Sequence, residues 1–377
     1  MKLKDILSLY CGYVTNVARL TRKSRKAYSL MRENKELVKK FKKTFYQYAY
    51  IHYDFANIFL KSYSIKSVKP IEISKIDLRK NDPILLCAVK NDLERIRLQV
   101  EHHRKIGIKH FAYIDNASTD GTFEWLKEQP DVSLFFTDET FNASVKNSWR
   151  RQVMDFLGYN RWYLVLDSDE LFIYPGVENK HIDVYINFLE SKKIRCVMSL
   201  LTDMYSNHKL FQKDTGINEI QNAYCYFDTD TYEVTNKFPI YYITGGPRTR
   251  LFSTNEDVFS CALQKYALIM VSEDMFVSTH EICPYTHNFE TEGVVAFLLH
   301  YKFLPGDDDI YKKHVASKLY FRDSLEYKKY AAVFEQNQDA SFYYNGSQKL
   351  NSSMDLLKIN VIDKNFFKNF GVVSNLP

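Results

Sequence analysis

From residue 83 onward, short apolar runs alternate with amphipathic stretches. Residues 84–89 form a continuous apolar run, typical of a strand buried on both faces of a sheet. In the stretch that follows, apolar positions recur every three or four residues, and Gly107 stands where a left-handed helix cap is expected. We predict further strands over 110–115, 132–136, 162–167 and 195–201, and helices over 92–105, 122–128, 143–157 and 182–190. This alternation predicts an α/β fold with a mostly parallel sheet flanked by helices and joined by right-handed crossovers.

The two ends of the chain have other patterns. Residues 1–65 read as helical, because apolar positions keep a helical spacing and neither Gly nor Pro interrupts them after Val14. Residues 204–242 show turns and polar aromatic residues rather than a period, as expected of an insertion. A helix is predicted over 309–334. We therefore expect a helical extension at 1–70, an α/β domain at 83–305 and a C-terminal helical segment with a tail at 306–377.

The composition agrees with the predicted fold class, and the distribution of charge indicates possible partners. The chain has 377 residues, of which 45% are hydrophobic and 26% charged, and this balance excludes a disordered or fibrous protein. The net charge is +5, and the first 69 residues are distinctly basic, with Leu, Phe and Tyr between the cations. Such a segment fits peripheral contact with an anionic membrane or a solvated helical face. Because no nucleic-acid-binding motif accompanies it, we expect no nucleic-acid partner.

Two further features bear on the compartment. No stretch reaches the ~18 apolar residues of a spanning helix, and the N-terminus lacks the apolar core of a signal peptide. The six cysteines are scattered without C-x-x-C pairs, so neither a disulfide framework nor a zinc site is indicated. We expect a cytoplasmic protein, peripheral at the inner face of the membrane if the basic segment binds lipid.

The sharpest chemical feature is an apolar strand that runs directly into three carboxylates. Asp167, Asp169 and Glu170 follow the run at 162–166. In open α/β sheets ligands bind at the carboxyl ends of strands, and two carboxylates spaced by one residue can hold one hard divalent ion. Mg²⁺ or Mn²⁺ there would neutralise a diphosphate leaving group. A solvated acidic turn is the alternative, but the preceding strand-helix alternation favours the metal site.

A second polar cluster follows the strand predicted over 110–115. Asp115 ends that strand and can accept hydrogen bonds from a base or ribose. Asn116 and Asp120 come next, and Asp120 can alternatively cap the following helix. The residues after the first predicted strand lack the G-x-G-x-x-G of a dinucleotide fold, which argues against hydride transfer.

The ordered set of motifs resembles the family 2 type glycosyltransferases of the GT-A fold, specifically a bacterial branch related to glycosyltransferase family 92. The matching segments lie at 89–92, 114–121, 166–172, 203–205, 245–252, 278–280 and 298–303. The resemblance covers about residues 83 to 350 and implies inverting transfer of a sugar from a nucleotide-diphospho-sugar. It also implies that Asp115 lies near the nucleoside and that Asp167 and Asp169 bind the metal. Asp92 stands where the family often has Glu, and its shorter carboxylate is assigned to the nucleotide edge.

Three other residues have two interpretations each. Arg248 and Arg250 follow a Gly-Gly pair on a predicted turn, where they either grip the donor phosphates or an anionic acceptor, or lie on the surface. His300 follows an apolar run and is either a third metal ligand or a core histidine with satisfied hydrogen bonds.

An inverting transfer also needs a base to accept the proton of the acceptor hydroxyl. The candidates are Asp203, Glu170 and Glu281, and we prefer Asp203 because it follows a predicted strand. His280 is either a base or a donor to the acceptor.

The sequence therefore predicts a glycosyltransferase that uses Mn²⁺ or Mg²⁺, a nucleotide-diphospho-sugar donor and a saccharide or glycolipid acceptor, as in surface polysaccharide synthesis. One alternative is a nucleotidyltransferase, which would need a Gly-rich or Lys/Arg-rich loop after the first strand, where the chain has only Lys90 and Arg95. A catalytically silent nucleotide-sugar-binding protein is the other alternative, and the intact acidic motif argues against it.

Overall fold

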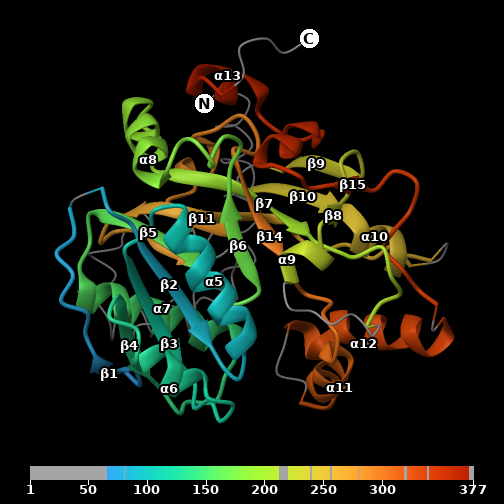
Figure 1. Ribbon diagram of the computed structural model, residues 1–377, viewed down its shortest axis with the longest axis horizontal. Helices are drawn as coiled ribbons and strands as arrows, with labels where there is room; N and C mark the ends of the chain where they lie inside the picture. The colour runs from blue at the N-terminus through green and yellow to red at the C-terminus, as the bar shows by residue number, and fades with distance from the viewer. Residues whose placement is uncertain are drawn as a thin grey trace, which may run out of the picture.

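A nine-stranded sheet forms the centre of the molecule in the computed structural model (Figure 1). The described residues are 66–372, without residues 80, 212–219, 238–239, 255–256, 279, 318–320 and 338. The predicted helices and membrane contact of residues 1–65 lie outside this range. In order across the sheet, the strands are β1 (Lys69–Glu72), β4 (Val132–Phe136), β3 (His110–Asp115), β2 (Ile84–Val89), β5 (Arg161–Leu166), β11 (Gln264–Val271), β7 (Cys196–Asp203), β14 (Ala296–His300) and β6 (Glu170–Ile173).

Most strands of this sheet point the same way. Strands β2, β3, β4, β5, β7 and β14 share one direction, while β1, β6 and β11 run against their neighbours. The predicted α/β class with a mostly parallel sheet is therefore confirmed. Strand β11 was not predicted, and it lies antiparallel between β5 and β7 in the middle of the sheet.

The helices that join the first strands cover both faces of the sheet. Helices α5 (Leu93–Lys105) and α6 (Thr122–Lys127) lie on one face and α7 (Ala143–Leu157) on the other (Figure 1), as right-handed crossovers require. These bounds lie within one or two residues of the predicted ones. Gly107 has φ +103°, which confirms the left-handed position past the end of α5.

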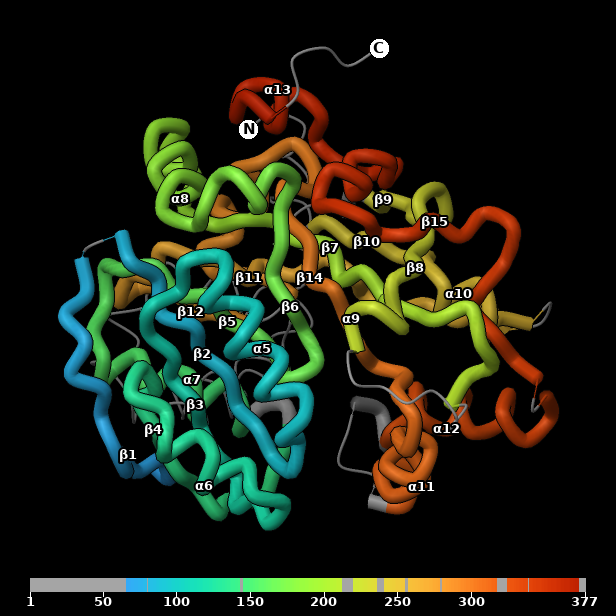
Figure 2. The backbone as a smooth tube through the Cα atoms, in the orientation of Figure 1, coloured from blue at the N-terminus to red at the C-terminus, as the bar shows by residue number. Residues whose placement is uncertain are grey.

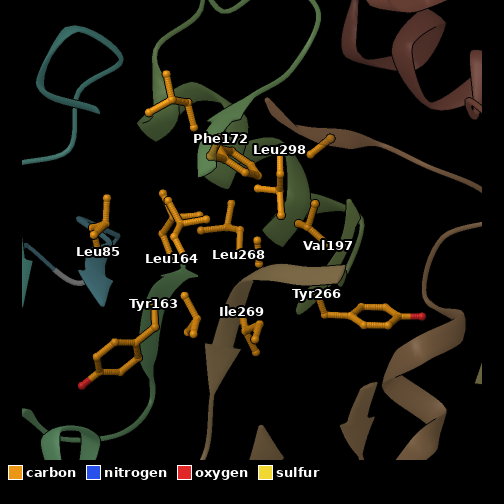
Figure 3. Close-up of a cluster of buried hydrophobic side chains, with 14 of the residues drawn as sticks. Leu85, Tyr163, Leu164, Phe172, Val197, Tyr266, Leu268, Ile269 and Leu298 are labelled. Atoms are coloured by element: carbon orange, nitrogen blue, oxygen red, sulfur yellow. The ribbon is translucent and has the colours of Figure 1, made fainter. Parts of the chain in front are cut away.

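The core forms where apolar strand residues meet under these helices. Nine of its side chains are labelled in Figure 3, and they come from six strands: Leu85, Tyr163, Leu164, Phe172, Val197, Tyr266, Leu268, Ile269 and Leu298. All nine are buried. The continuous apolar runs of the sequence thus correspond to strands covered on both faces.

Residues 204–242 contain more regular structure than the sequence predicted. A hairpin is formed by β9 (Tyr232–Lys237) and β10 (Ile240–Gly245), so the expectation of turns alone is wrong here. The alternation of β9 is hidden in the sequence because the apolar Val234 is 47% exposed, so the strand does not show a simple apolar-in, polar-out pattern.

After the hairpin, Gly245 makes a tight turn. It has φ +104°, and a Cβ atom there would lie 2.0 Å from the carbonyl oxygen of Thr231. Helix α10 (Gly246–Phe252) begins at once, and it carries the two arginines that were expected on a turn.

The C-terminal segment adds two helices beside the carboxyl end of β14. In place of one helix over 309–334, the chain forms α11 (Asp307–Ser317) and α12 (Phe321–Gln336), seen together in Figure 2. A second apolar cluster contains Phe252, Phe303, Tyr311, Tyr330 and Phe342, and it joins these helices to α10. Among the described residues, no helix is both long enough and apolar enough to cross a membrane.

The remaining elements are short. The last helix, α13 (Lys364–Phe370), packs on α8 (Ile182–Ser191) through rings such as Tyr185 and Phe370, whose centroids are 5.3 Å apart. The others are α9 (Ile220–Ala223), β8 (Tyr226–Phe227), β12 (Phe276–Ser278), β13 (Glu281–Cys283), the 3-10 helix Tyr285–Phe289, β15 (Gln348–Lys349) and the 3-10 helix Ser353–Lys358.

Candidate active site

The carboxyl ends of β5, β7 and β14 bring the acidic motif together with two residues that are distant in sequence. Asp203 ends β7 and His300 ends β14, and these two residues are paired in the register of the parallel strands. Asp167 and Asp169 lie in the turn between β5 and β6, and the side chain of each keeps 27% of its surface exposed. The site is therefore partly open to solvent at the position where α/β folds bind ligands.

A chain of hydrogen bonds starts at Asp169 and runs into the protein. Asp169 Oδ2 lies 3.1 Å from His300 Nε2, and His300 Nδ1 lies 2.6 Å from Asp203 Oδ1. On its other oxygen, Asp203 accepts a hydrogen bond of 2.8 Å from Arg248 Nε. The side chains of His300, Asp203 and Arg248 are each at most 5% exposed. Of these four side chains, Asp169 is the one accessible to solvent.

The two carboxylates of this hydrogen-bond series, Asp169 and Asp203, favour positive charge at the His300 imidazole. Burial acts to raise the pKa of Asp169, but attraction to His300 and their hydrogen bond outweigh it, so the pKa lies below its ordinary value. Burial likewise acts to lower the pKa of His300, but Asp169 and Asp203 raise it overall. The pair of carboxylates therefore stabilises positive charge between them, whether a proton or a metal carries it.

The donor set of Asp169 and His300 fits a divalent metal ion. Two ligands of one ion, each about 2.1 Å from it and at a right angle, lie about 3 Å apart, and the two donor atoms here are 3.1 Å apart. A histidine that binds metal through one nitrogen usually donates from the other to a carboxylate, as His300 does to Asp203. Carboxylate oxygen and imidazole nitrogen are both ordinary ligands of Mn²⁺.

Asp167 faces a different group of side chains. Lys146 and Arg150 of α7 donate to its Oδ1 at 2.8 and 2.7 Å, and Lys265 of β11 donates to its Oδ2 at 2.9 Å. Burial acts to raise the pKa of Asp167, but the three cations hold it well below the ordinary value. Glu170 is buried and also pairs with Lys265. The two aspartates of the motif thus have separate partners, and the structure pairs only Asp169 with His300.

The acidic turn is held in place by Gln99, a residue that no sequence motif marks as functional. From α5, its Nε2 donates to the carbonyl oxygens of Asp167 and Glu170 at 2.8 and 2.9 Å, and its Oε1 accepts from Tyr113 at 2.8 Å. Gln99 is fully buried. A polar residue on the buried face of an amphipathic helix was the only signal in the sequence.

We expect Gln99→Leu to destabilise the protein by about 2–4 kcal/mol, since each buried polar group left without a partner costs about 1–3 kcal/mol. Urea unfolding would measure the free energy of unfolding, and the exposed Gln336→Leu, at the end of α12, is the control. The control should change it by no more than about 0.5 kcal/mol. Equal midpoints for the two variants would contradict this role of Gln99.

The predicted nucleoside residues have distinct surroundings. Asp115 is fully buried; its Oδ1 accepts from the backbone of Ser118 at 2.9 Å, and its Oδ2 has no hydrogen-bond partner in the described part of the chain. Burial raises the pKa of Asp115. Asn116 donates its amide hydrogens to two backbone carbonyls, each 3.0 Å away. Asp120 accepts from the backbone of Leu93 and Thr122, so its carboxylate caps the starts of α5 and α6.

Asp92 belongs to a network that links α5 to the C-terminal segment. Its carboxylate accepts from Ser168 at 2.5 Å and from Arg95 at 3.2 Å. Arg95 also pairs with Asp307 at the start of α11 and donates to the carbonyl oxygen of Tyr301 at 2.9 Å. Burial raises the pKa of Asp307 to about 6. Asp92 thus lies beside the acidic turn, but a cation already occupies part of its carboxylate.

The two arginines after the Gly-Gly pair take different positions. Arg248 is buried against Asp203, whereas Arg250 pairs with Asp228 at 3.0 Å and lies over the ring of Tyr344, 4.0 Å from its centre. Neither guanidinium lies on a surface hairpin. Arg248 contacts the candidate site through Asp203, while Arg250 contacts none of its carboxylates.

His280 lies near Asp167 and is only partly buried. Its Nδ1 is 2.9 Å from the carbonyl oxygen of Gln264, and because a carbonyl only accepts, Nδ1 carries the proton. Burial, and then the nearby charge of Lys265, lower the pKa of His280 to about 4. The imidazole is therefore neutral at pH 7, with its lone pair on Nε2.

A second group of possible metal ligands lies at the opposite end of β7. Cys196, His287 and Glu290 place one donor atom each within 4.8 Å of the others. The carboxylate of Glu290 already accepts from the backbone of Arg195 and Cys196 and pairs with His287. This arrangement is explained by Glu290 satisfying backbone groups at the start of β7, with no need for an ion.

Comparison with known proteins does not establish a function for this chain. No protein-family model and no curated protein matches this sequence. One similar solved structure is the mannosyltransferase PcManGT from Pyrobaculum calidifontis in complex with GDP-Man and Mn²⁺, with 16% identity, a TM-score of 0.25, and coverage of 39% of this chain and 44% of that one. Another is S. aureus TarS 1-349, with 10% identity, a TM-score of 0.30, and coverage of 67% and 70%.

A third is a UDP-glucose pyrophosphorylase in complex with UDP-glucose, with 9% identity, a TM-score of 0.25, and coverage of 58% of this chain and 90% of that one. The chain spans less than half the length of the mannosyltransferase. At TM-scores no higher than 0.30, these likenesses carry no argument about activity.

Proposed function

We propose that this chain is a GT-A type glycosyltransferase that moves a sugar from a nucleotide-diphospho-sugar to a hydroxyl acceptor, with inversion and with Mn²⁺ or Mg²⁺. The observation that carries the proposal is the pair Asp169 and His300, oriented by Asp203 at the carboxyl edge of a mostly parallel sheet. The resemblance of the motifs to family 2 type glycosyltransferases supports it. We further propose a saccharide or glycolipid acceptor and a location at the cytoplasmic face of a membrane.

The residues divide the work of binding. Asp169 and His300 hold the metal, which when bound neutralises the charge that develops on the departing diphosphate. Asp203 fixes the orientation of the His300 ring from behind. Following the resemblance, we assign Asp115 to the nucleoside, and its buried Oδ2, which has no hydrogen-bond partner among the described residues, is the oxygen left to accept a hydrogen bond. Asp167 anchors Lys146, Arg150 and Lys265, which leaves a surplus of positive charge beside the place of the phosphates.

Four residues were candidates for the base, and the three carboxylates among them, Asp203, Glu170 and Glu281, are all buried. Both oxygens of Asp203 are occupied, by His300 and Arg248, and its side chain is 2% exposed. Glu170 is 1% exposed and bound to Lys265 and to the backbone of Asp167. His280 is only partly buried and presents a neutral Nε2, so we assign it to accept the proton of the acceptor hydroxyl. If His280→Gln transferred sugar at the rate of the wild type, another residue would have to be the base.

We expect nucleotide-diphospho-sugars to stabilise the protein only when Mn²⁺ is present. A donor at about 100 times its dissociation constant adds about 2.7 kcal/mol to the free energy of unfolding. A panel of uridine, guanosine, adenosine and thymidine diphospho-sugars, scanned by thermal unfolding with Mn²⁺ and with chelator, measures this. Slow release of the nucleoside diphosphate from the stabilising donor then separates an enzyme from a silent binder. Failure of every donor to stabilise the Mn²⁺-loaded protein would overturn the proposal.

Adding the nucleoside triphosphates to the same panel distinguishes the nucleotidyltransferase alternative. That activity would join a nucleoside triphosphate to a sugar phosphate and release inorganic diphosphate, so stabilisation by a triphosphate together with formation of a nucleotide-sugar would identify it.

A further inference from the structure

The C-terminal segment places a carboxylate beside the candidate metal site. Glu326 of α12 accepts on one oxygen from Arg248 at 3.0 Å and from Lys302 at 3.1 Å. Tyr330, one turn along the same helix, donates to that oxygen as well and is fully buried in the second apolar cluster. Packing of α12 therefore fixes where this negative charge lies.

The two cations that Glu326 holds are both close to metal-site carboxylates. Arg248 is bound to Asp203, and Lys302 directly follows Tyr301, whose backbone N–H donates to the carbonyl oxygen of Asp169 at 2.8 Å. Their side chains are 3% and 13% exposed, so the charges are poorly screened by water and repel one another. A divalent ion on Asp169 would meet the same repulsion.

We propose that Glu326 is a positioning residue for the metal site, which rests on the metal-dependent function proposed above. By binding Lys302, Glu326 keeps that ammonium group from taking the place of the metal on Asp169. By binding Arg248, it keeps the guanidinium on Asp203, which in turn orients His300. The position of α12 thus sets the affinity of a metal site that lies on another part of the fold.

The test is titration of the full chain with Mn²⁺ alone, followed by the electron paramagnetic resonance signal of the free ion. Glu326→Gln keeps the size of the side chain but removes its charge, and we expect it to weaken Mn²⁺ binding about 10-fold, the lower end of the effect of outer-shell partners. The control is Glu335→Gln, an exposed position on the same helix, which should bind Mn²⁺ as the wild type does. Circular dichroism confirms that each variant is folded.

A double variant tests the physical cause. If the released ammonium competes with the metal, Glu326→Gln with Lys302→Met should regain most of the lost affinity, although a merely loosened α12 would not be repaired. Equal affinity of Glu326→Gln and Glu335→Gln, or a double variant as weak as Glu326→Gln, would overturn the inference. Absence of Mn²⁺ binding by the wild type would instead overturn the proposed metal site, and this inference with it.

Discussion

Asp169→Asn is expected to reduce the rate of sugar transfer by about 10²–10³-fold, the cost of losing one preorganised electrostatic group in a transition state. The change keeps the shape of the side chain and removes the charge that attracts both His300 and the metal. It should also abolish the Mn²⁺-dependent stabilisation by the donor. Product formation and thermal unfolding, measured on the same preparations, would check the two effects.

The control for this variant is Asp77→Asn, which removes an exposed carboxylate that precedes β2 and so lies away from the carboxyl ends of the strands. It should leave both the rate and the stabilisation by donor unchanged. If Asp169→Asn kept the Mn²⁺-dependent stabilisation of the wild type, the assignment of Asp169 as a metal ligand would be wrong, whatever happened to the rate.

The sequence predicted the strands and helices between residues 84 and 166 well, because local patterns set these elements. Strands β2, β3, β4 and β5 are continuous apolar runs that carry their own signal, and the helices between them have a clear period. Strand β11 is not part of this alternation of strands and helices, because its neighbours β5 and β7 lie far away in the sequence. Its antiparallel place in the sheet depends on tertiary pairing, which a local pattern does not encode.

The candidate site shows the same division. Asp169, His300 and Asp203 were each selected from the sequence, but as ligand, possible ligand and base. The register of β7 and β14 brings His300 and Asp203 together across 97 residues, and burial then changes the role assigned to Asp203. The cations around Asp167 come from α7 and β11 and were not selected at all. Residue types could be predicted from motifs, but their partners depended on the folded sheet.

The partnership of Asp203 with Arg248 leads to the largest expected effect on stability. Both side chains are at most 3% exposed, and Arg248 Nη2 has no hydrogen-bond partner among the described residues. Asp203→Asn removes the fully buried one of the two carboxylates that pair with this guanidinium and leaves it with Glu326, which is 34% exposed; breaking a buried pair in this way costs about 3–5 kcal/mol. Urea unfolding of the metal-free protein would measure the loss. The control is Asp339→Asn, whose pair with Lys209 is exposed on both sides (77% and 57%), and it should cost no more than about 1 kcal/mol.

A second variant shows whether the loss of stability comes from the charge that remains on Arg248 or from the missing contact with Asp203. Replacing both partners, as Asp203→Leu with Arg248→Met, removes the desolvation cost of two buried ions, and such exchanges are often neutral or stabilising. We therefore expect the double variant to be more stable than Asp203→Asn. Because it also removes the carboxylate behind His300, it should still bind Mn²⁺ about 10–100-fold more weakly than the wild type. Recovered stability with weak metal binding would separate the two roles of Asp203, whereas wild-type metal affinity in the double variant would contradict its part in orienting His300.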